Sequence, residues 1–298
     1  MKWKNALHDY QLFLKIERGL SKNTVDSYKR DLEKLILFLK NNNISSNPIT
    51  IDKNNLQEFI YQIAKEVNPR SQARIISGLR SFFEYLIFED YRNTNPTTLI
   101  ESPKIGRKLP DTLSEKDINI LISSIDLSHP QGERNRTIIE TLYSCGLRVS
   151  ELINLKISDL FFDEGLIKVV GKGNKERFVP IHNTAKKYIT FYITKLRTQV
   201  APKKGFEDTL FLNRRGNALT RQMIFTIIRK LAEKINLDKK ISPHTLRHSF
   251  ATHLIKNGAD LRAIQQMLGH ESITTTEVYV HLDNSYLKEV LETYHPRK

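Results

Sequence analysis

The sequence predicts a two-domain, mainly α-helical protein whose second domain carries a small antiparallel β-hairpin. Three observations lead to this prediction. The chain has 298 residues, which is enough for two domains that each bury a core of their own. Apolar residues recur every three or four positions over about the first 92 residues. Beyond a proline-containing connection, helical segments surround one short segment with a strand-like pattern.

Four amphipathic helices account for the first part of the chain. Their apolar residues recur at the three- and four-residue spacing that places them on one helix face. Ser21 precedes the second helix, where its hydroxyl group can accept a hydrogen bond from a free backbone N–H group. The apolar stripes cover about residues 3–14, 25–39, 56–63 and 75–86.

A change in composition marks the boundary between the two domains. Residues 93–114 contain three prolines and a glycine among polar residues, with no sustained periodicity. This composition is typical of an interdomain connection, because proline and glycine interrupt regular elements. We therefore expect an N-terminal domain at residues 1–107 and a second domain at residues 108–298, with a C-terminal tail from about residue 283.

The second domain mixes helices with a hairpin. Residues 166–181, LIKVVGKGNKERFVPI, alternate like two strands that are joined by a glycine-rich turn. Ser242-Pro243 is typical of the start of a helix, and Gly146 and Gly269 are typical of positions just after the end of a helix. Helices are expected near residues 115–123, 134–145, 183–197, 221–235, 243–257, 261–268 and 273–280.

The net charge of the chain indicates which class of partner it binds. Lysine and arginine number 47 against 33 acidic residues, a net charge of +14, so a nucleic acid would release condensed counterions on binding. Apolar stretches such as residues 35–39 are far too short to cross a bilayer, so no membrane partner is expected. The N-terminus has no secretory pattern, and Cys145 is the single cysteine; together they indicate a reducing cytoplasm.

The segment PHTLRHSFATHL, residues 243–254, places three histidines and an arginine in one helix. His244 and His248 lie four residues apart, as paired zinc ligands do, but no glutamate lies between them and Arg247 would repel a cation. His244 and Arg247 together suit an anion with several oxygens, such as a phosphate. For an isolated pair a solvated helix face is the commoner explanation. His248 and His253 are expected to be a packing residue and a helix-end residue.

Three other segments carry groups that suit phosphate chemistry. Arg148 follows the end of a predicted helix, and Glu151 stands three residues on, where its carboxylate could orient the guanidinium group. Lys172 lies between two glycines at the hairpin turn, which permits close approach to a groove. His270 lies at a corner after a helix-ending glycine, and Tyr279 follows nine residues later.

Taken together, these segments resemble the tyrosine recombinase (phage integrase) family. GLRVSEL, VVGKGNKER, HTLRHSFATHL and LGHESITTTEVYVH occur in the order and at the separations of that family, and NGADLRAIQQMLGH and the terminal YHPR are most similar to its Xer subgroup. The resemblance covers essentially the whole chain. It implies a four-helix, SAM-like core-binding domain, followed by a mostly helical catalytic domain. Cys145 differs mildly from the pattern of the family, in which a small or hydroxylated residue is more usual at this position. This difference is not expected to affect the chemistry.

The resemblance implies a site-specific DNA recombinase with a covalent intermediate. Tyr279 would attack a phosphodiester, form a 3′-phosphotyrosyl link and release a 5′-hydroxyl group. A phenol has an ordinary pKa near 10, so the site must help to remove its proton, and His244 is the family's candidate base. Lys172 would protonate the departing 5′-oxygen.

The remaining residues of the implied site stabilise charge. Arg148 and Arg247 would hold the non-bridging oxygens, whose negative charge grows in the transition state, while His270 would donate a further hydrogen bond. Glu151 is a supporting residue and not a reactant. With this set, neither a metal nor ATP nor another cofactor is expected.

Double-stranded DNA is the expected partner, and its contacts are expected on both domains. Arg74 and Arg80 in the fourth helix, with Arg221 and Gln222 at the start of a later helix, suit such contacts by type and position, although an exposed basic face explains them equally well. The resemblance implies a tetramer on two DNA sites, either of this chain alone or with a paralogous recombinase. It also implies a septal DNA translocase as a further partner.

The tail has two interpretations. Tyr286, Leu287, Val290, Leu291 and Tyr294 form an apolar stripe that could pack on its own domain or dock in a neighbouring protomer. The resemblance favours the neighbour.

Three functions remain open from the sequence. The first is a recombinase that resolves chromosome or plasmid dimers, or, with similar architecture, a mobile-element integrase. The second is an inactive DNA-binding architectural protein. The third is a metal-dependent nuclease, which is disfavoured because the sequence offers no carboxylate cluster.

Overall fold

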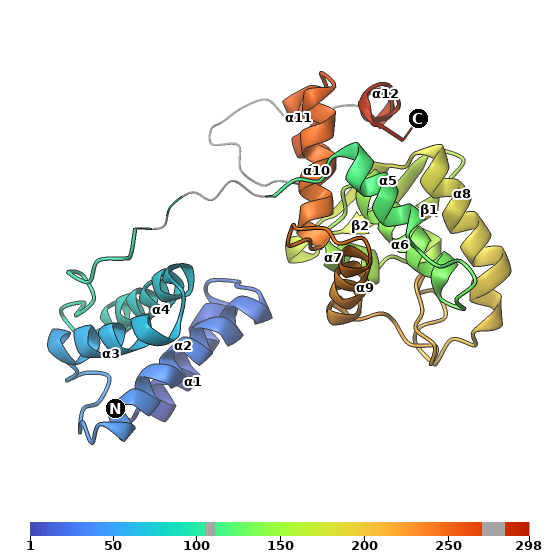
Figure 1. Ribbon diagram of the computed structural model, residues 1–298. Coiled ribbons are helices and arrows are strands. Elements are labelled where there is room, and N and C mark those ends of the chain that lie inside the picture. The colour runs from blue at the N-terminus through green and yellow to red at the C-terminus, as the bar shows by residue number, and fades with distance from the viewer. Residues whose placement is uncertain (105, 107–110, 270–283, 298) are drawn as a thin grey trace. The chain divides into compact units, whose positions relative to one another are not determined.

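The computed structural model describes residues 1–104, 106, 111–269 and 284–297 (Figure 1). Its contacts divide the chain into two compact units, Met1–Lys108 and Leu109–Lys298. Each unit has its own hydrophobic core. The predicted fold class, a helical N-terminal domain followed by a mostly helical domain with a small antiparallel sheet, is confirmed.

Three helices of unit 1 begin at N-cap side chains that the sequence encodes. The side chains of Ser21, Asp52 and Asn68 each accept a hydrogen bond from a backbone N–H group in the first turn of the helix that follows. These caps satisfy donors that a helix cannot satisfy internally. The helices are α1 (Trp3–Ile16), α2 (Lys22–Asn41), α3 (Lys53–Glu66) and α4 (Pro69–Phe88).

The core of unit 1 lies between these helices. Tyr10, Leu35, Leu56 and Phe82 are fully buried at its centre. The Tyr10 hydroxyl group donates to Ser81 Oγ at 2.9 Å, so this buried polar group is satisfied. The apolar stripes of the sequence therefore mark the buried faces of the helices.

Unit 2 contains the remaining helices and the sheet. None of the helices in the described ranges is long and apolar enough to cross a membrane. After α8, the chain continues through a π-helical turn, Tyr192–Leu196, and a 3₁₀ turn, Arg197–Gln199. The α-helices are α5 (Glu115–Ser123), α6 (Gly132–Ser144), α7 (Val149–Ile153), α8 (Asn183–Phe191), α9 (Arg221–Lys234), α10 (Pro243–Lys256), α11 (Leu261–Leu268) and α12 (Asn284–Tyr294).

The sheet has three antiparallel strands in the order β1-β2-β3. β2 (Leu166–Val170) and β3 (Glu176–Pro180) form the predicted hairpin, and the two-residue strand β1 (Leu160–Phe161) adds to its edge. The turn of the hairpin is a short 3₁₀ segment, Lys172–Asn174, in which Gly173 has a φ of 72°. The sequence did not predict β1 or the five-residue helix α7. The predicted helix at 273–280 lies outside the described residues.

Gly146 fixes the junction between α6 and α7. Its φ is 57°, and a Cβ atom there would lie 2.5 Å from Cδ1 of Phe250 in α10. Only glycine combines this backbone conformation with so close an approach. The junction therefore brings α10 against the residues that begin α7.

Helix α12 packs on its own domain, against β3, α10 and α11. Leu287, Val290 and Leu291 are almost completely buried, and Asn257 Nδ2 donates to the Tyr294 backbone oxygen at 2.7 Å. This arrangement corresponds to the first of the two interpretations of the tail.

The residues after α12 are also anchored. His295 is fully buried and contacts the Tyr143 ring, with a centroid separation of 4.9 Å. Burial lowers the pKa of His295 to about 3, so its imidazole is neutral at physiological pH. Arg297 Nε lies 3.0 Å from the buried Glu140 carboxylate.

A leucine substitution tests whether α12 is part of the core of unit 2 in solution. We expect Leu291→Ala to reduce the free energy of unfolding of unit 2 by about 2–5 kcal/mol, because it removes buried methyl groups and leaves a cavity. Leu261→Ala is the matched control, since this leucine is 56 % exposed, and we expect it to have little effect.

Urea denaturation with two probes gives the measurement. Circular dichroism follows both units, whereas the fluorescence of Trp3, the single tryptophan, follows unit 1. The Leu291→Ala variant should shift the circular dichroism transition and leave the fluorescence transition in place. Equal transitions for the two leucine variants would contradict packing of α12 on its own domain.

Candidate active site

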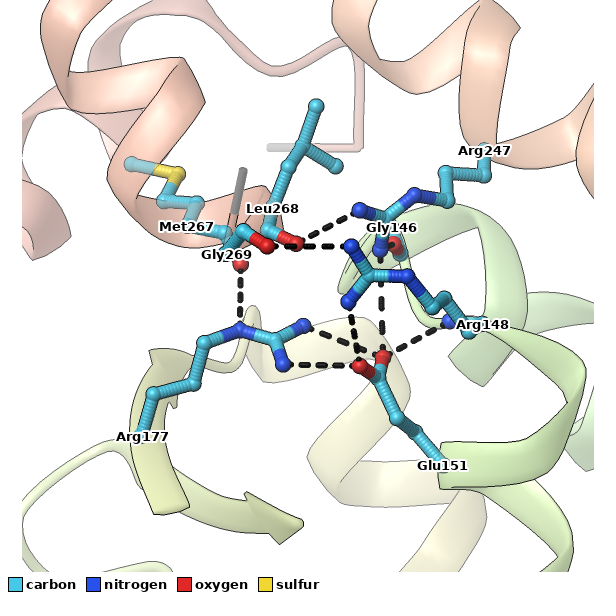
Figure 2. Close-up of polar contacts among 8 residues, drawn as sticks. All are labelled: Gly146, Arg148, Glu151, Arg177, Arg247, Met267, Leu268 and Gly269. Carbon is cyan, nitrogen blue, oxygen red and sulfur yellow. Dashed lines mark hydrogen bonds and ion pairs between the residues drawn. The ribbon is translucent and has the colours of Figure 1, made fainter. Parts of the chain in front are cut away.

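Three arginines from three different elements meet at the C-terminal end of α11 (Figure 2). Arg177 Nε donates to the Met267 backbone oxygen at 3.0 Å. Arg247 Nη2 donates to the next carbonyl oxygen, that of Leu268, at 2.5 Å. Arg148 Nη2 donates to Gly269, the following residue, at 3.0 Å. These carbonyl groups have no partner within the helix, and the helix dipole makes its C-terminus favourable for positive charge.

The same three arginines surround the carboxylate of Glu151 (Figure 2). Arg177 binds it through two hydrogen bonds, of 2.7 and 3.0 Å. Arg148 donates to it at 2.8 Å from Nη1, and Arg247 Nη1 lies 3.8 Å away. The Arg148 backbone N–H group also donates to Glu151, at 2.8 Å. Glu151 thus caps α7 and holds three guanidinium groups with one side chain.

The local sequence explains why Arg148 and Arg247 point to the same place. Arg148 is the N-cap residue of α7, immediately after the Gly146 turn. Arg247 lies in the second turn of α10, which begins at Ser242-Pro243 with a capping hydrogen bond from Thr245 to Ser242. Arg247 Nη1 donates to the Gly146 backbone oxygen at 2.7 Å, which ties α10 to this junction.

The arginine pocket, defined here as Arg148, Glu151, Arg177 and Arg247, is positively charged. Three guanidinium groups and one carboxylate leave a net charge of +2. The side chain of Glu151 is 1 % exposed, whereas that of Arg148 is 28 % exposed. An anion that approaches this pocket meets donors that are already oriented, which is the requirement for electrostatic stabilisation of developing charge.

The acid–base properties of the pocket follow from burial and from the neighbouring charges. Burial raises the pKa of the Glu151 carboxyl group, but hydrogen bonds and charge from Arg177, then Arg148, outweigh burial and hold this pKa below its ordinary value. Burial and then repulsion from Arg148 lower the pKa of Arg247 to about 10. Arg247 and Glu151 are therefore both charged at neutral pH.

His244 lies beside this pocket. It is exposed, and it lines an open cavity of about 430 Å³ together with Arg247 and His248. His253, in contrast, is buried, and its Nδ1 lies 2.8 Å from the Tyr143 hydroxyl oxygen. The helix thus presents His244 and Arg247 to one cavity and uses His253 in the core.

The structure describes only some of the residues that the sequence proposed for the site. Arg148, Glu151, His244 and Arg247 are described as above. Lys172 begins the hairpin turn, and its side chain lies outside what the structure describes. His270 and Tyr279 also lie outside the described residues.

Sequence reasoning missed Arg177. Its signal is the alternation of β3, which places Arg177 on the same face of the strand as Val179, and Val179 is fully buried. An arginine on an inward-facing strand position needs a partner, because burying an unpaired charge is unfavourable. Glu151 is that partner.

The residues proposed for DNA contacts differ in their surroundings. Arg74 Nη1 binds the Asp31 carboxylate and donates to Ser27 Oγ at 2.6 Å, so this guanidinium group has partners within unit 1. Arg80 Nη2 donates to the Ile100 backbone oxygen at 3.2 Å. Arg221 and Gln222 are exposed at the start of α9.

Comparison with known proteins identifies the family. The phage integrase family matches residues 111–285, and the phage integrase N-terminal SAM-like domain matches residues 7–90. The chain therefore belongs to the phage integrase family and is a tyrosine-type site-specific DNA recombinase. The resemblance that the sequence motifs indicated is confirmed.

Within this family, the chain is similar to proteins named tyrosine recombinase XerD. It is 43 % identical to the XerD of Staphylococcus haemolyticus, with 99 % of each chain covered. It is 44 % identical to the XerD of Oceanobacillus iheyensis, with 98 % of each chain covered.

Solved recombinase structures are also similar. The XerA recombinase is 31 % identical over the full length of both chains, with a TM-score of 0.51. XerH site-specific recombinase bound to its difH substrate, in a pre-cleavage complex, is 27 % identical, with a TM-score of 0.68 over 83 % of this chain and 74 % of that one.

Replacement of Glu151 tests the arginine pocket. We expect Glu151→Gln to reduce the free energy of unfolding of unit 2 by about 3–5 kcal/mol at pH 7, because three guanidinium groups lose their shared counter-charge. The folded-state pKa of Glu151 is below its unfolded value, so its contribution is fully present above about pH 4.3 and is lost as the pH falls through the folded-state pKa.

Melting temperatures between pH 7 and pH 3 give the measurement. The difference between the natural protein and Glu151→Gln should be constant from pH 7 to about pH 5 and should shrink below that. Glu233→Gln serves as a control, because its side chain is 65 % exposed and pairs with a surface arginine at 3.4 Å. A difference that grows on acidification would show that this carboxylate does not stabilise the pocket.

Proposed function

We propose that this protein cleaves and rejoins DNA strands through a covalent 3′-phosphotyrosyl intermediate. The observation that carries the proposal is the arginine pocket, in which three guanidinium groups outnumber their one carboxylate beside His244. A phosphodiester gains negative charge on its non-bridging oxygens when a nucleophile attacks, and oriented donors stabilise this charge. The proposed DNA partner also suits a chain of net charge +14.

Each step has a proposed residue. The Tyr279 oxygen forms a bond to phosphorus, and the bond from phosphorus to the 5′-oxygen breaks. His244 accepts the phenolic proton, and Lys172 donates a proton to the departing oxygen. Arg148, Arg247 and His270 stabilise the charge on the phosphate.

The energy of the broken bond is stored in the phosphotyrosine. Attack by a 5′-hydroxyl group of another strand reverses the same steps and rejoins the DNA, so the reaction needs neither ATP nor a metal ion.

The biological role that we propose is resolution of chromosome or plasmid dimers in the cytoplasm, in support of chromosome partition at cell division. The similarity to proteins named XerD supports this role. The active assembly is proposed to be a tetramer on two DNA sites, either of this chain alone or with a paralogue of XerC type, with a septal translocase of FtsK type as a regulator. Integration of a mobile element is the alternative for the same chemistry.

Covalent trapping tests the chemistry. A nicked DNA substrate that loses the short fragment bearing the new 5′-hydroxyl group after cleavage should leave the protein attached to DNA, in the presence of EDTA. Tyr279→Phe should abolish this adduct, because no phenolic oxygen remains. Tyr286→Phe is the matched control in the tail, and its adduct yield should equal that of the natural protein.

The adduct is detected as a band of reduced mobility in a denaturing gel. Adduct formation by Tyr279→Phe would overturn the assignment of the nucleophile. Free DNA ends in the presence of metal, without an adduct, would indicate a nuclease. DNA binding without any cleavage would indicate an architectural protein.

A salt titration tests the proposed DNA contacts. Arg221→Ala should weaken DNA binding and reduce the slope of log K against log salt concentration by about 1, since one phosphate contact is lost. Arg74→Ala should mainly lower the stability of unit 1, because Arg74 pairs with buried Asp31. Fluorescence anisotropy at several salt concentrations measures DNA binding by Arg221→Ala, and urea denaturation followed by Trp3 fluorescence measures the stability of unit 1 in Arg74→Ala. An unchanged salt slope for Arg221→Ala would exclude it as a phosphate contact.

A further inference from the structure

Arg177 is the member of the arginine pocket whose surroundings suggest a role apart from contact with DNA. It is the second residue of β3, opposite Val169 of β2, and thus belongs to the hairpin whose turn begins at Lys172. Its side chain is 15 % exposed, about half the exposed fraction of Arg148. Its guanidinium group donates hydrogen bonds to the Glu151 carboxylate and to the Met267 backbone oxygen.

These contacts join three elements. Two parallel hydrogen bonds bind the guanidinium group of Arg177 to the Glu151 carboxylate in α7, and Nε binds the Met267 backbone oxygen at the end of α11. A two-bond arginine–carboxylate pair fixes orientation as well as distance. Arg177 therefore holds the hairpin in a defined place relative to the element that carries Arg148.

Two glycines pack against this side chain. A Cβ atom on Gly269 would lie 3.0 Å from Arg177 Cδ, and a Cβ atom on Gly171 would lie 3.5 Å from Arg177 Nη1 and 3.7 Å from Glu151 Oε1. Gly171 is the residue immediately before Lys172. The guanidinium group thus contacts the base of the turn on one side and the end of α11 on the other.

We propose that Arg177 is a positioning residue, which acts through the hairpin to place Lys172 at the leaving 5′-oxygen. The inference rests on the proposed function, in which Lys172 donates the proton. Loss of Arg177 would free the base of the turn from Glu151 and α11 and leave Arg148 and Arg247 as charged donors. DNA would then bind normally, but proton donation to the leaving oxygen would be impaired.

A pair of DNA substrates separates this role from a general structural one. One substrate has the natural phosphodiester at the cleaved position, and the other has sulfur in place of the bridging 5′-oxygen. A thiol has an ordinary pKa near 8.5, so the sulfur leaves as a thiolate and does not need the proton that an alkoxide needs. The rate of the first cleavage is measured with excess protein for both substrates.

We expect Arg177→Gln to cleave the natural substrate about 100-fold more slowly, which is the cost of misplacing a catalytic group by about 1 Å. With the sulfur substrate, the cleavage rate of Arg177→Gln relative to that of the natural protein should rise at least tenfold. The same rise is expected for Lys172→Ala. DNA affinity should stay within about twofold. Arg177→Lys keeps the positive charge but lacks the planar fork, so it should show a similar defect and similar rescue.

Arg134→Gln controls for the loss of a buried arginine. Arg134 is 8 % exposed and donates to the Leu212 backbone oxygen at 3.1 Å and to Gln131 Oε1 at 2.9 Å, outside the arginine pocket. We expect this variant to lose stability but to keep the natural ratio of the two cleavage rates. If Arg177→Gln does not fold, Arg177→Lys supplies the test, because it retains a counter-charge for Glu151.

The outcomes distinguish the two levels of the proposal. If sulfur rescues Lys172→Ala but neither Arg177 variant, the proposed function stands and the positioning role of Arg177 is overturned. If sulfur does not rescue Lys172→Ala, proton donation by Lys172 fails, and the role of Arg177 through it fails as well. Natural cleavage rates in both Arg177 variants would also overturn the inference.

Discussion

The site depends on the pairing of one buried carboxylate with three guanidinium groups. The guanidinium groups of these arginines would repel one another if Glu151 and the carbonyl groups at the end of α11 did not offset their charge. Because the carboxylate offsets only one of the three positive charges, the pocket keeps a net attraction for an anion. The same bonds that stabilise the fold thus hold the donors in the orientation that phosphate chemistry needs.

Regular helices could be predicted closely from the sequence. The boundaries expected for α5 and α11 agree with the structure, because each has a clear apolar stripe and a polar N-cap residue, Ser114 and Asp260. The helix α7 and the strand β1 were missed for a physical reason. Five and two residues are too few to show a period of 3.6 or 2, and these elements form because the surrounding core and sheet hold them.

The candidate site was only partly predictable. Arg148 with Glu151, and His244 with Arg247, could be proposed because each pair is three residues apart in the sequence. The structure brings Arg148, Glu151 and Arg247 together and places His244 and Arg247 at one cavity. Arg177 was missed because a charged residue near a hairpin turn usually faces water, and its partner Glu151 is 26 positions away in the chain. The packing of the tail could not be predicted for a similar reason. An apolar stripe predicts that a helix face is buried, but it does not identify the surface against which that face packs.

The packing of the segment that follows α12 has a practical consequence for handling the protein. His295 is fully buried, and Arg297 forms an ion pair with Glu140, which is itself 1 % exposed. A tag or fluorescent label attached close to Arg297 would lie beside these contacts and would compete with the packing of α12. Labels for purification or imaging are therefore better placed at exposed polar positions elsewhere on the surface.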